Sequence, residues 1–355
     1  LSHICFVRSC MAMFILSGLS SKIAGRLKGY IEKEIEINNI SCDLEGFYGF
    51  KTVDKLYSAD KDFKIPFSSV DAILNRGDFL LSVGFLYNSI HLILVRGDFT
   101  QAQEIIDWFA EVNEKYKYLH AQGDFEEFSA QKAVFFHQYD EAEKHLKSAM
   151  SIRNELGEDL MKLKLLGLQL EIEIDKANFE FGLTLINQMH DIVNAVGKMS
   201  IVPHFYVNLP VSLAKFFIAK IEYNKITNGE LVDKDNKNLS LKWAKEAVKT
   251  AKIYGPYLTE AYRLYAQVFW LIGNQHKALK WFQESIDEGQ RNQIRFALSH
   301  TYFEVGNRLL EPQSKYKELN GITADEYLEK ARVMFEEMDM QWDLEQLEKV
   351  KTEMN

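Results

Sequence analysis

Residues 259–290 read TEAYRLYAQVFWLIGNQHKALKWFQESIDEGQ, and the spacing of their apolar side chains decides the fold. The first half carries four side chains at i, i+3, i+4 and i+7, which is one face of an α-helix: Tyr262, Tyr265, Ala266 and Phe269. Gly273 then supplies a turn, because glycine tolerates the positive φ at which many helices end. The second half presents another helical face, formed by Ala278, Phe282 and Ser285. The stretch predicts two helices packed antiparallel, which the small side chains of Ala266 and Ala278 would let approach closely.

Weaker copies of this unit occur along the chain. Three second helices carry their small marker residues 40 residues apart, at Ala102, Ala142 and Gly182. Another second helix is marked by Ala244, which lies 34 residues before Ala278. The last pair is marked by Leu298, Ser299 and Tyr302, and then by Ala324, Leu328 and Ala331. Repetition with a period of 34 to 40 residues predicts an array of helix pairs.

The unit at residues 259–290 resembles the tetratricopeptide repeat (TPR). That family has a large residue, a small residue and an aromatic on its first helix, a glycine-polar turn, and a small–aromatic–small pattern on its second. Tyr262 stands where the repeat usually has tryptophan, and Gln290 stands where it usually has proline. The resemblance implies an all-α fold, an α-solenoid of antiparallel helix pairs wound into a TPR-like superhelix. It also implies a concave groove that binds a protein or peptide.

The repeats suggest three parts of the chain. We expect residues 1–69 to form a helical segment followed by an irregular linker, or the end of a preceding repeat region. Residues 70–202 would hold degenerate TPR-like repeats, and residues 203–355 further repeats followed by a C-terminal capping helix. The stretch PHFYVNLP at residues 203–210 is predicted to be irregular and to separate the two groups.

Two polar insertions interrupt the second group of repeats. Residues 226–238 (ITNGELVDKDNKN) and residues 311–322 (EPQSKYKELNGI) are predicted as surface loops between the two helices of their pairs. Residues 43–69 are rich in glycine, aromatic and polar residues and match no repeat. If the protein were an enzyme, its site would lie in these loops or in residues 43–69.

The composition excludes several classes of protein. Of 355 residues, 47% are apolar and 26% charged, as in ordinary globular proteins. Five prolines are too few for the many turns of an all-β sandwich or barrel. A net charge of −9 leaves no basic excess for phosphates, so we expect no nucleic-acid partner. Cys5, Cys10 and Cys42 form no CxxC pair, which favours a reducing, cytoplasmic location over a disulfide framework or a zinc site.

The N-terminal segment leaves several interpretations open. The chain begins at Leu1, which favours a processed chain or a fragment of a longer protein. Residues 4–19 are the most apolar stretch, but Arg8 interrupts them, and a membrane span needs roughly 20 apolar residues. We expect a buried core helix here, with a remnant signal, an anchor or a membrane span as alternatives. The basic residues 20–34 could contact an acidic partner or a membrane surface, or form a solvated helix face.

Catalytic signatures are missing from the sequence. It contains no phosphate-binding loop, dinucleotide-binding turn, HExxH or GxSxG motif. Three possible metal ligands are spaced by four residues, but the first falls at a predicted turn, so we expect a solvated face: His137, Glu141 and His145. Three carboxylates alternate around a predicted helix with no histidine or lysine partner nearby: Glu171, Glu173 and Asp175. We therefore predict no catalytic residue, no cofactor and no metal ligand.

The C-terminal end carries a narrower resemblance. Residues 322–350, ITADEYLEKARVMFEEMDMQWDLEQLEKV, resemble the last helices of large signalling ATPases. In those proteins a nucleotide-binding domain, sometimes with a cyclase or kinase domain, precedes a long helical-repeat region. The catalytic residues of those families are absent from this sequence. The resemblance implies the regulatory arm of a larger signalling protein, whereas the repeats alone imply a stand-alone adaptor.

The sequence thus favours a non-catalytic scaffold for protein–protein interaction in signal transduction, with a protein or peptide in its groove. An enzyme and a membrane-tethered repeat protein are the alternatives. Polar residues gathered on the groove face would favour binding, whereas buried titratable pairs would favour catalysis.

Overall fold

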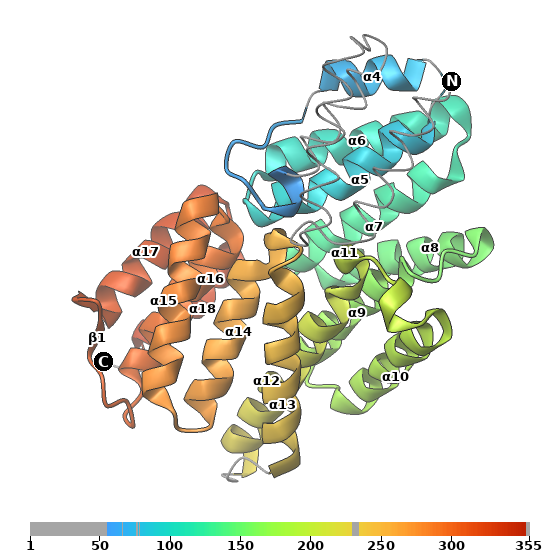
Figure 1. Cartoon of the computed structure of the whole chain (residues 1–355). Helices are drawn as coiled ribbons and strands as arrows, with labels where there is room; N and C mark the ends of the chain where they lie inside the picture. Colours follow the sequence, from blue (N-terminus) through green and yellow to red (C-terminus); the bar gives the residue numbers. More distant parts are fainter. Residues whose placement is uncertain (1–54, 66, 76, 78, 229–233, 353–355) are drawn as a thin grey trace, which may run out of the picture.

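The computed structural model describes residues 55–65, 67–75, 77, 79–228 and 234–352, and most of them are helical (Figure 1). The predictions for residues 4–19 and 20–34 and for the three cysteines lie outside the described residues. The helices of the first half are α4 (Phe67–Asn75), α5 (Phe79–Val95), α6 (Phe99–Tyr116), α7 (Leu119–Phe135), α8 (Tyr139–Leu156), α9 (Lys162–Asp175) and α10 (Phe179–Val196). Those of the second half are α11 (Pro203–Tyr206), α12 (Asn208–Asn228), α13 (Lys234–Ala251), α14 (Leu258–Leu271), α15 (Gln275–Asn292), α16 (Arg295–Leu310), α17 (Ala324–Glu337) and α18 (Gln341–Thr352).

Consecutive helices pack together as antiparallel pairs. The pairs are α5 with α6, α7 with α8, α9 with α10, α12 with α13, α14 with α15, and α16 with α17. Two short 3₁₀ turns, η1 (Lys198–Ser200) and η2 (Gly255–Tyr257), connect elements of the array. The predicted all-α solenoid of antiparallel helix pairs is therefore confirmed.

The first helices of the pairs form an inner ring. Helices α5, α7, α9, α12, α14 and α16 contact one another in chain order, and α16 also contacts α5. The second helices α8, α10, α13, α15 and α17 pack mainly against their own partners, whereas α6 packs more extensively against α7 than against α5. The array therefore curls until its first and last pairs meet, and we call the six first helices the inner ring.

The turn within four of the pairs has the same geometry. A backbone N–H donates to the carbonyl oxygen five residues earlier, directly after a residue with positive φ, at Gly97–Asp98, His137–Gln138, Ala177–Asn178 and Gly273–Asn274. This is the hydrogen bond of a Schellman motif, which satisfies a carbonyl at the end of a helix. The side chains of Asp98, Asn178 and Asn274 then cap the following helix. One turn structure thus repeats through the array.

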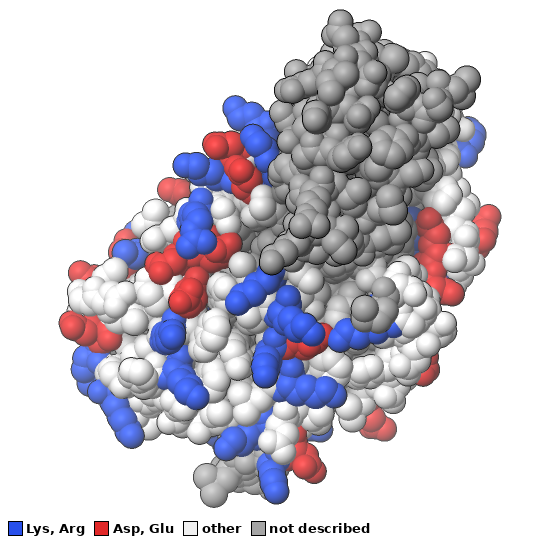
Figure 2. Space-filling view, viewed as in Figure 1, with Lys and Arg blue, Asp and Glu red and all other residues white. Residues whose placement is uncertain are grey.

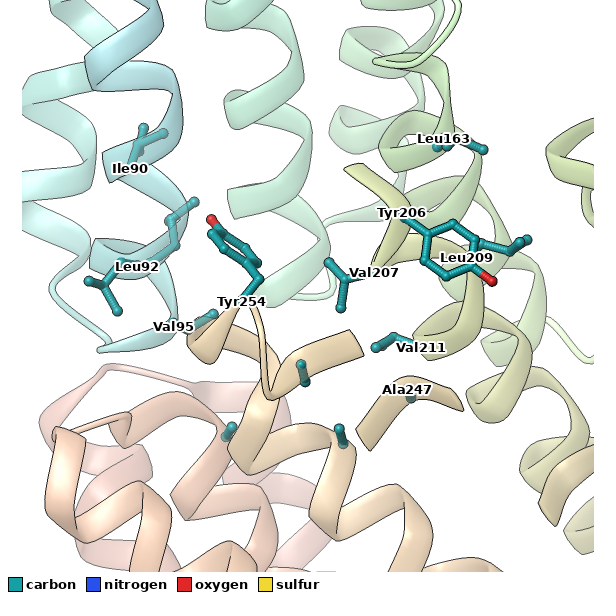
Figure 3. Packing of buried hydrophobic residues seen from close by; sticks show 14 of the residues in the cluster. Ile90, Leu92, Val95, Leu163, Tyr206, Val207, Leu209, Val211, Ala247 and Tyr254 are labelled. Atoms are coloured by element: carbon teal, nitrogen blue, oxygen red, sulfur yellow. The ribbon is translucent and has the colours of Figure 1, made fainter. Parts of the chain in front are cut away.

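The hydrophobic core continues from the first group of repeats into the second. One cluster of buried side chains extends from Leu56 to Ala297. Figure 3 shows Ile90 and Leu92 of α5 in that cluster together with Tyr254, which precedes η2, and with residues of α9, α11, α12 and α13. At Gly255 an added Cβ would lie 2.9 Å from the carbonyl oxygen of Tyr57, so a larger residue would separate two segments far apart in sequence.

The second polar insertion contains a small β-hairpin. The predicted surface loop does connect α16 to α17, but the prediction did not include strands β1 (Glu318–Leu319) and β2 (Ile322–Thr323), which pair antiparallel. Asn320 and Gly321 form the turn with φ of 52° and 75°, a conformation that Asn-Gly pairs favour. The side chain of Gln275 on α15 holds the loop by bonding the carbonyl of Gln313 and the N–H of Lys315.

Two other stretches are more helical than predicted. Helix α12 continues to Asn228 and α13 begins at Lys234, so the described residues of the predicted loop are helical, and residues 229–233 are not described. The described polar residues of this predicted loop lie at the end of α12 and the start of α13. Residues 203–210 form α11 and the start of α12, because Pro203 and Pro210 both occupy first turns, where no helical N–H is required.

Candidate functional site

A cavity of about 220 Å³ lies between helices of the inner ring. Helices α7, α9, α12, α14 and α16 contribute its wall. One part of the wall is apolar and includes Val134, Phe135, Ile218, Leu264 and Phe296. The other part is charged, with four carboxylates and two cations, Glu171, Asp175, Glu222, Glu260, Lys215 and Arg263. We call this space the axial cavity.

Lys215 of α12 joins three helices in the wall of the axial cavity. Its Nζ lies 2.8 Å from a carboxylate oxygen of Glu171 on α9 and 2.8 Å from one of Glu260 on α14. Burial opposes the charge of Lys215, but the two carboxylates hold its pKa above the ordinary value. Burial raises the pKa of Glu171, whereas Lys215 and Arg263 outweigh burial at Glu260 and lower its pKa. Lys215 is therefore held as an ammonium ion between two acceptors.

Arg308 of α16 forms a second ionic cluster beside the cavity. Its guanidinium bonds Glu304 at 2.6 Å, Glu311 at 2.6 Å, and Glu222 across the ring on α12. The pKa of Arg308 is raised because these carboxylates outweigh its burial. The pKa of Glu304 is lowered despite burial, first by Arg308 and next by a hydrogen bond from Gln267. Glu222, in contrast, has a raised pKa because of its burial.

Asp175 and Glu222 are the two most exposed of the four carboxylates in the wall of the axial cavity. Their side chains are 38% and 32% exposed, whereas Glu260 is 16% exposed. Asp175 accepts a hydrogen bond from the hydroxyl of Tyr139, and Nδ1 of His137 lies 3.4 Å from Asp175. Asp175 is therefore a partly exposed carboxylate of the cavity wall that already has two polar neighbours.

Two buried polar atoms of the wall have no hydrogen-bond partner among the described residues. They are Oε1 of Gln267, an acceptor, and Nε of Arg263, a donor. Gln267 is only 6% exposed, and its amide already bonds Glu304. Neither atom has appreciable surface that water can reach, so both are polar groups enclosed within the wall and not groups presented to the cavity.

A further ionic cluster links the inner ring to an outer helix. Glu127 of α7 accepts a hydrogen bond from Tyr87 of α5 at 2.8 Å and pairs with Lys164 of α9 at 3.1 Å. Arg153 of α8 bonds both Glu127 and Asp124. Burial raises the pKa of Asp124 to about 7, even though Arg153 works in the opposite direction. This cluster connects four helices and lies outside the wall of the axial cavity.

The structure corrects the prediction for the three alternating carboxylates. Glu171 has a lysine partner in Lys215, and Asp175 lies beside His137, although both partners are distant in sequence. Glu173 faces elsewhere and accepts from Gln169 and Asn178. Two of the three thus belong to the axial cavity.

The possible metal ligands do not share a helix face. His137 lies in the turn before α8 with φ of 55° and stacks on Trp342 of α18. His145 pairs instead with Glu126 at 2.6 Å and approaches Glu141 at 3.9 Å. Among the described residues, no group of His, Cys, Asp and Glu is arranged to hold a metal ion.

The predicted repeat positions lie in helix interfaces and one turn. Gly273 has φ of 83° in the turn between α14 and α15. The remaining positions are buried: Ala102, Ala142, Gly182, Ala244, Tyr262, Ala266, Phe269, Ala278, Phe282 and Ala331. Close contact is visible at Gly182, where an added Cβ would lie 2.6 Å from the ring of Phe216.

The outer surface differs in charge from the cavity. Figure 2 shows Lys and Arg gathered over the lower part of one face, where Figure 1 places α13 to α15. The exposed lysines of α13 and α15 and the turn after α13 are Lys234, Lys242, Lys245, Lys249, Lys252, Lys277 and Lys280. Carboxylates therefore gather in the axial cavity while this outer face is basic.

Comparison with known proteins found no family model that matches the chain and no curated protein similar to it. Within the described part of the chain, no helix has both the length and the apolar character needed to cross a bilayer.

Proposed function

We propose that the chain is a non-catalytic protein-binding module with a TPR-like scaffold, whose axial cavity receives part of a partner protein. The observation that carries this proposal is the axial cavity itself, a space of about 220 Å³ whose wall combines apolar and charged side chains from several helices. A peptide suits such a wall, because it brings side chains together with backbone donors and carbonyl acceptors. Such a module could act as a stand-alone adaptor or as the regulatory arm of a larger signalling protein.

The charged groups of the cavity favour binding over catalysis. Lys215 has a raised pKa between two carboxylates, so at neutral pH it carries no lone pair for a nucleophile or base. Glu260 has a lowered pKa and is engaged by Lys215 and Arg263. Ion pairs between helices explain these shifts without a reaction, since structural networks also perturb pKa values.

The TPR-like character is supported by the repeated turn. Four inner helices end in the same Schellman hydrogen bond, and a polar residue follows each positive-φ residue. The markers of the second helices repeat at 34 or 40 residues, close to the 34 residues of the TPR. A common turn and a common period are what a chain built from one repeated unit would have.

Selection of binding peptides tests the proposal. Random dodecapeptides displayed on phage would be selected on the wild-type chain and retested on two variants that each add a benzyl group. Ala219→Phe fills the cavity wall, whereas Ala110→Phe places the same group on outer helix α6. We expect selected peptides to bind the wild type and Ala110→Phe, and to lose at least about tenfold in affinity on Ala219→Phe. Equal binding of the peptides to both variants would show that they do not bind in the axial cavity.

A further inference from the structure

We propose that helix α18 is held by a proton-linked clasp, in which His300 and His137 supply the positive charge opposite the buried carboxylate of Asp343. The inference goes beyond the proposed function and does not depend on it. Asp343 lies in the first turn of α18, and its side chain is 6% exposed. Among the described residues, no lysine or arginine pairs with it, and its ionic partners are the two histidines. A buried carboxylate needs such partners, because burial of an uncompensated charge is costly.

His300 of α16 faces an acceptor at each of its ring nitrogens. Its Nδ1 lies 2.8 Å from the carbonyl oxygen of Phe296, and its Nε2 lies 3.0 Å from Oδ1 of Asp343. A neutral imidazole has one N–H and can serve only one of the two acceptors, whereas the protonated ring serves both. A proton on Asp343 in place of the ring has the same consequence. The docked α18 therefore holds one proton more than the separated groups.

His137, in the turn between α7 and α8, approaches the other oxygen of the same carboxylate. The hydroxyl of Tyr139 donates to Asp175, so its oxygen accepts from Nδ1 of His137. Nε2 of His137 lies 4.0 Å from Oδ2 of Asp343, which has no hydrogen-bond partner among the described residues. Protonation of Nε2 places positive charge opposite this oxygen. The ring also stacks on Trp342, and the face of an indole attracts a cation.

The other elements around the clasp do not supply a competing cation. The charged groups that α9, α12 and α14 bring to this region are Glu171, Asp175, Lys215, Glu222, Glu260 and Arg263. Asp175 lies 3.4 Å from Nδ1 of His137, so it also favours the charged ring. The others are paired among themselves or with Arg308. Helix α17 contributes Phe335, which packs edge-on against His300 and carries no charge.

Proton binding and docking of α18 are therefore linked, and the direction of the pH effect follows. The docked helix favours protonated histidines, so this contribution to stability is full at acidic pH. It is lost as the pH rises through the neutral range in which histidine gives up its charge. Helix α18 should thus dock less tightly at pH 8 than at pH 6. His91 acts in the opposite direction and at lower pH, because it is buried as a neutral ring.

Hydrogen–deuterium exchange of the full chain tests the inference, read by mass spectrometry on peptides from α18. Observed rates are divided by the intrinsic exchange rate at each pH, and peptides from α13, which contains no histidine, serve as the reference in the same sample. Relative to α13, we expect α18 to be protected at least about threefold more at pH 6 than at pH 8. The double variant His137→Gln with His300→Gln should lose this difference, because an amide donates a hydrogen bond without taking up a proton. His276→Gln, at an exposed position on α15, should keep it.

A second variant tests the clasp from the side of the carboxylate. Asp343→Asn removes the charge that the histidines neutralise, so the protection of α18 in this variant should no longer depend on pH. Wild-type protection that is equal at both pH values, or higher at pH 8, would overturn the clasp. A wild-type pH dependence in Asp343→Asn or in the double histidine variant would overturn it as well. The peptide selection with Ala219→Phe does not involve these residues, so the proposed function is tested separately.

Discussion

The imidazole of His137 lies face to face with the indole of Trp342, with ring centroids 3.6 Å apart and an interplanar angle of 19°. His137 belongs to the turn between α7 and α8, and Trp342 belongs to the last described helix. The neighbouring Asp343 accepts a hydrogen bond from His300 of α16 at 3.0 Å. Helix α18 therefore fastens the end of the array to an early repeat, in addition to covering α17.

Removing this stacking contact should lower the stability of the array. We expect Trp342→Ala to lower the free energy of unfolding by about 1 to 2 kcal/mol, from the lost aromatic pair and apolar contact. Val333→Ala is the control, because Val333 is 40% exposed and Trp342 41% exposed, and Val333 has no such aromatic partner. Urea unfolding followed by circular dichroism measures both. Equal effects of the two substitutions would show that the stacking does not stabilise the fold.

Two glycines in equivalent turns should respond differently to alanine. Gly97 and Gly273 have φ of 72° and 83°, so alanine strains either turn by about 1 kcal/mol. At Gly97 an added Cβ would also lie 2.2 Å from the sulfur of Met338, whereas at Gly273 nothing lies within 4 Å. We expect Gly97→Ala to lower the melting temperature clearly more than Gly273→Ala. Similar melting temperatures would mean that the turn at Gly97 does not contact Met338, which directly follows α17.

A third repeated turn contains an alanine, and there a change to glycine should stabilise the protein. Ala177 adopts φ of 53° in the exposed turn before α10. Because glycine adopts this conformation without steric cost, Ala177→Gly should stabilise the protein, by at most about 1 kcal/mol after the greater freedom of the unfolded chain is counted. Thermal unfolding monitors the change. Destabilisation comparable to that of a glycine within a helix would contradict the turn geometry.

Arg153 should be essential to the buried cluster around α7. Arg153→Met leaves Asp124 buried without its cation and Glu127 with Lys164 alone, and we expect a loss of about 3 to 5 kcal/mol in stability. Neutralising the carboxylates in the same chain, with Asp124→Asn and Glu127→Gln, should recover a large part of the loss. Chemical denaturation compares the single and triple variants. If the triple variant were no more stable than Arg153→Met, unpaired charge would not be the cause of the loss.

His91 should make the protein sensitive to acid. Burial, with a smaller contribution from Lys164, lowers its pKa from 6.5 to about 3 in the folded state. Between these values the unfolded chain binds a proton that the folded chain does not, so stability falls as pH decreases from 6.5 toward 3. The slope from this residue approaches about 1.4 kcal/mol per pH unit.

Replacing the imidazole should reduce that slope. His91→Phe keeps the stacking on Tyr257 and removes the proton, while His276→Phe changes an exposed position on α15. Part of the acid sensitivity should remain, because burial lowers the pKa of His204 to about 3 as well. Unfolding free energies between pH 4 and pH 7 provide the measurement. An unchanged slope in His91→Phe would mean that the imidazole is not buried as a neutral group.

The helix pairs could be predicted because their signals are local. Apolar spacing around Tyr262 and Phe282 and a turn residue such as Gly273 identify two helices within about 30 residues of sequence. Closure of the array could not be predicted in this way, since it depends on small rotations summed over six pairs. Phe296 and Met338, which contact the first pair, have the same pattern as ordinary core residues.

The axial cavity was not predicted from the sequence for a related reason, although one charged residue within an apolar stretch indicates a buried charge. Lys215 is the single charge within the apolar stretch of residues 209–219, LPVSLAKFFIA, which is unusual for a solvated residue. Its partners Glu171 and Glu260 come from other helices, so no local spacing connects them. Similarly, Asn320-Gly321 is a hairpin signal that a purely helical template overlooks.

The contact between α5 and α16 changes how this array should lose its structure. In an open solenoid each repeat touches only its neighbours, so the terminal repeats can fray independently and the chain unfolds in stages. Here the two terminal repeats protect each other, and neither can detach without breaking the contacts of Phe296 with Phe99 and Phe135. Melting should accordingly proceed as one cooperative transition, with slow amide exchange in the outermost pairs as well as in the middle ones.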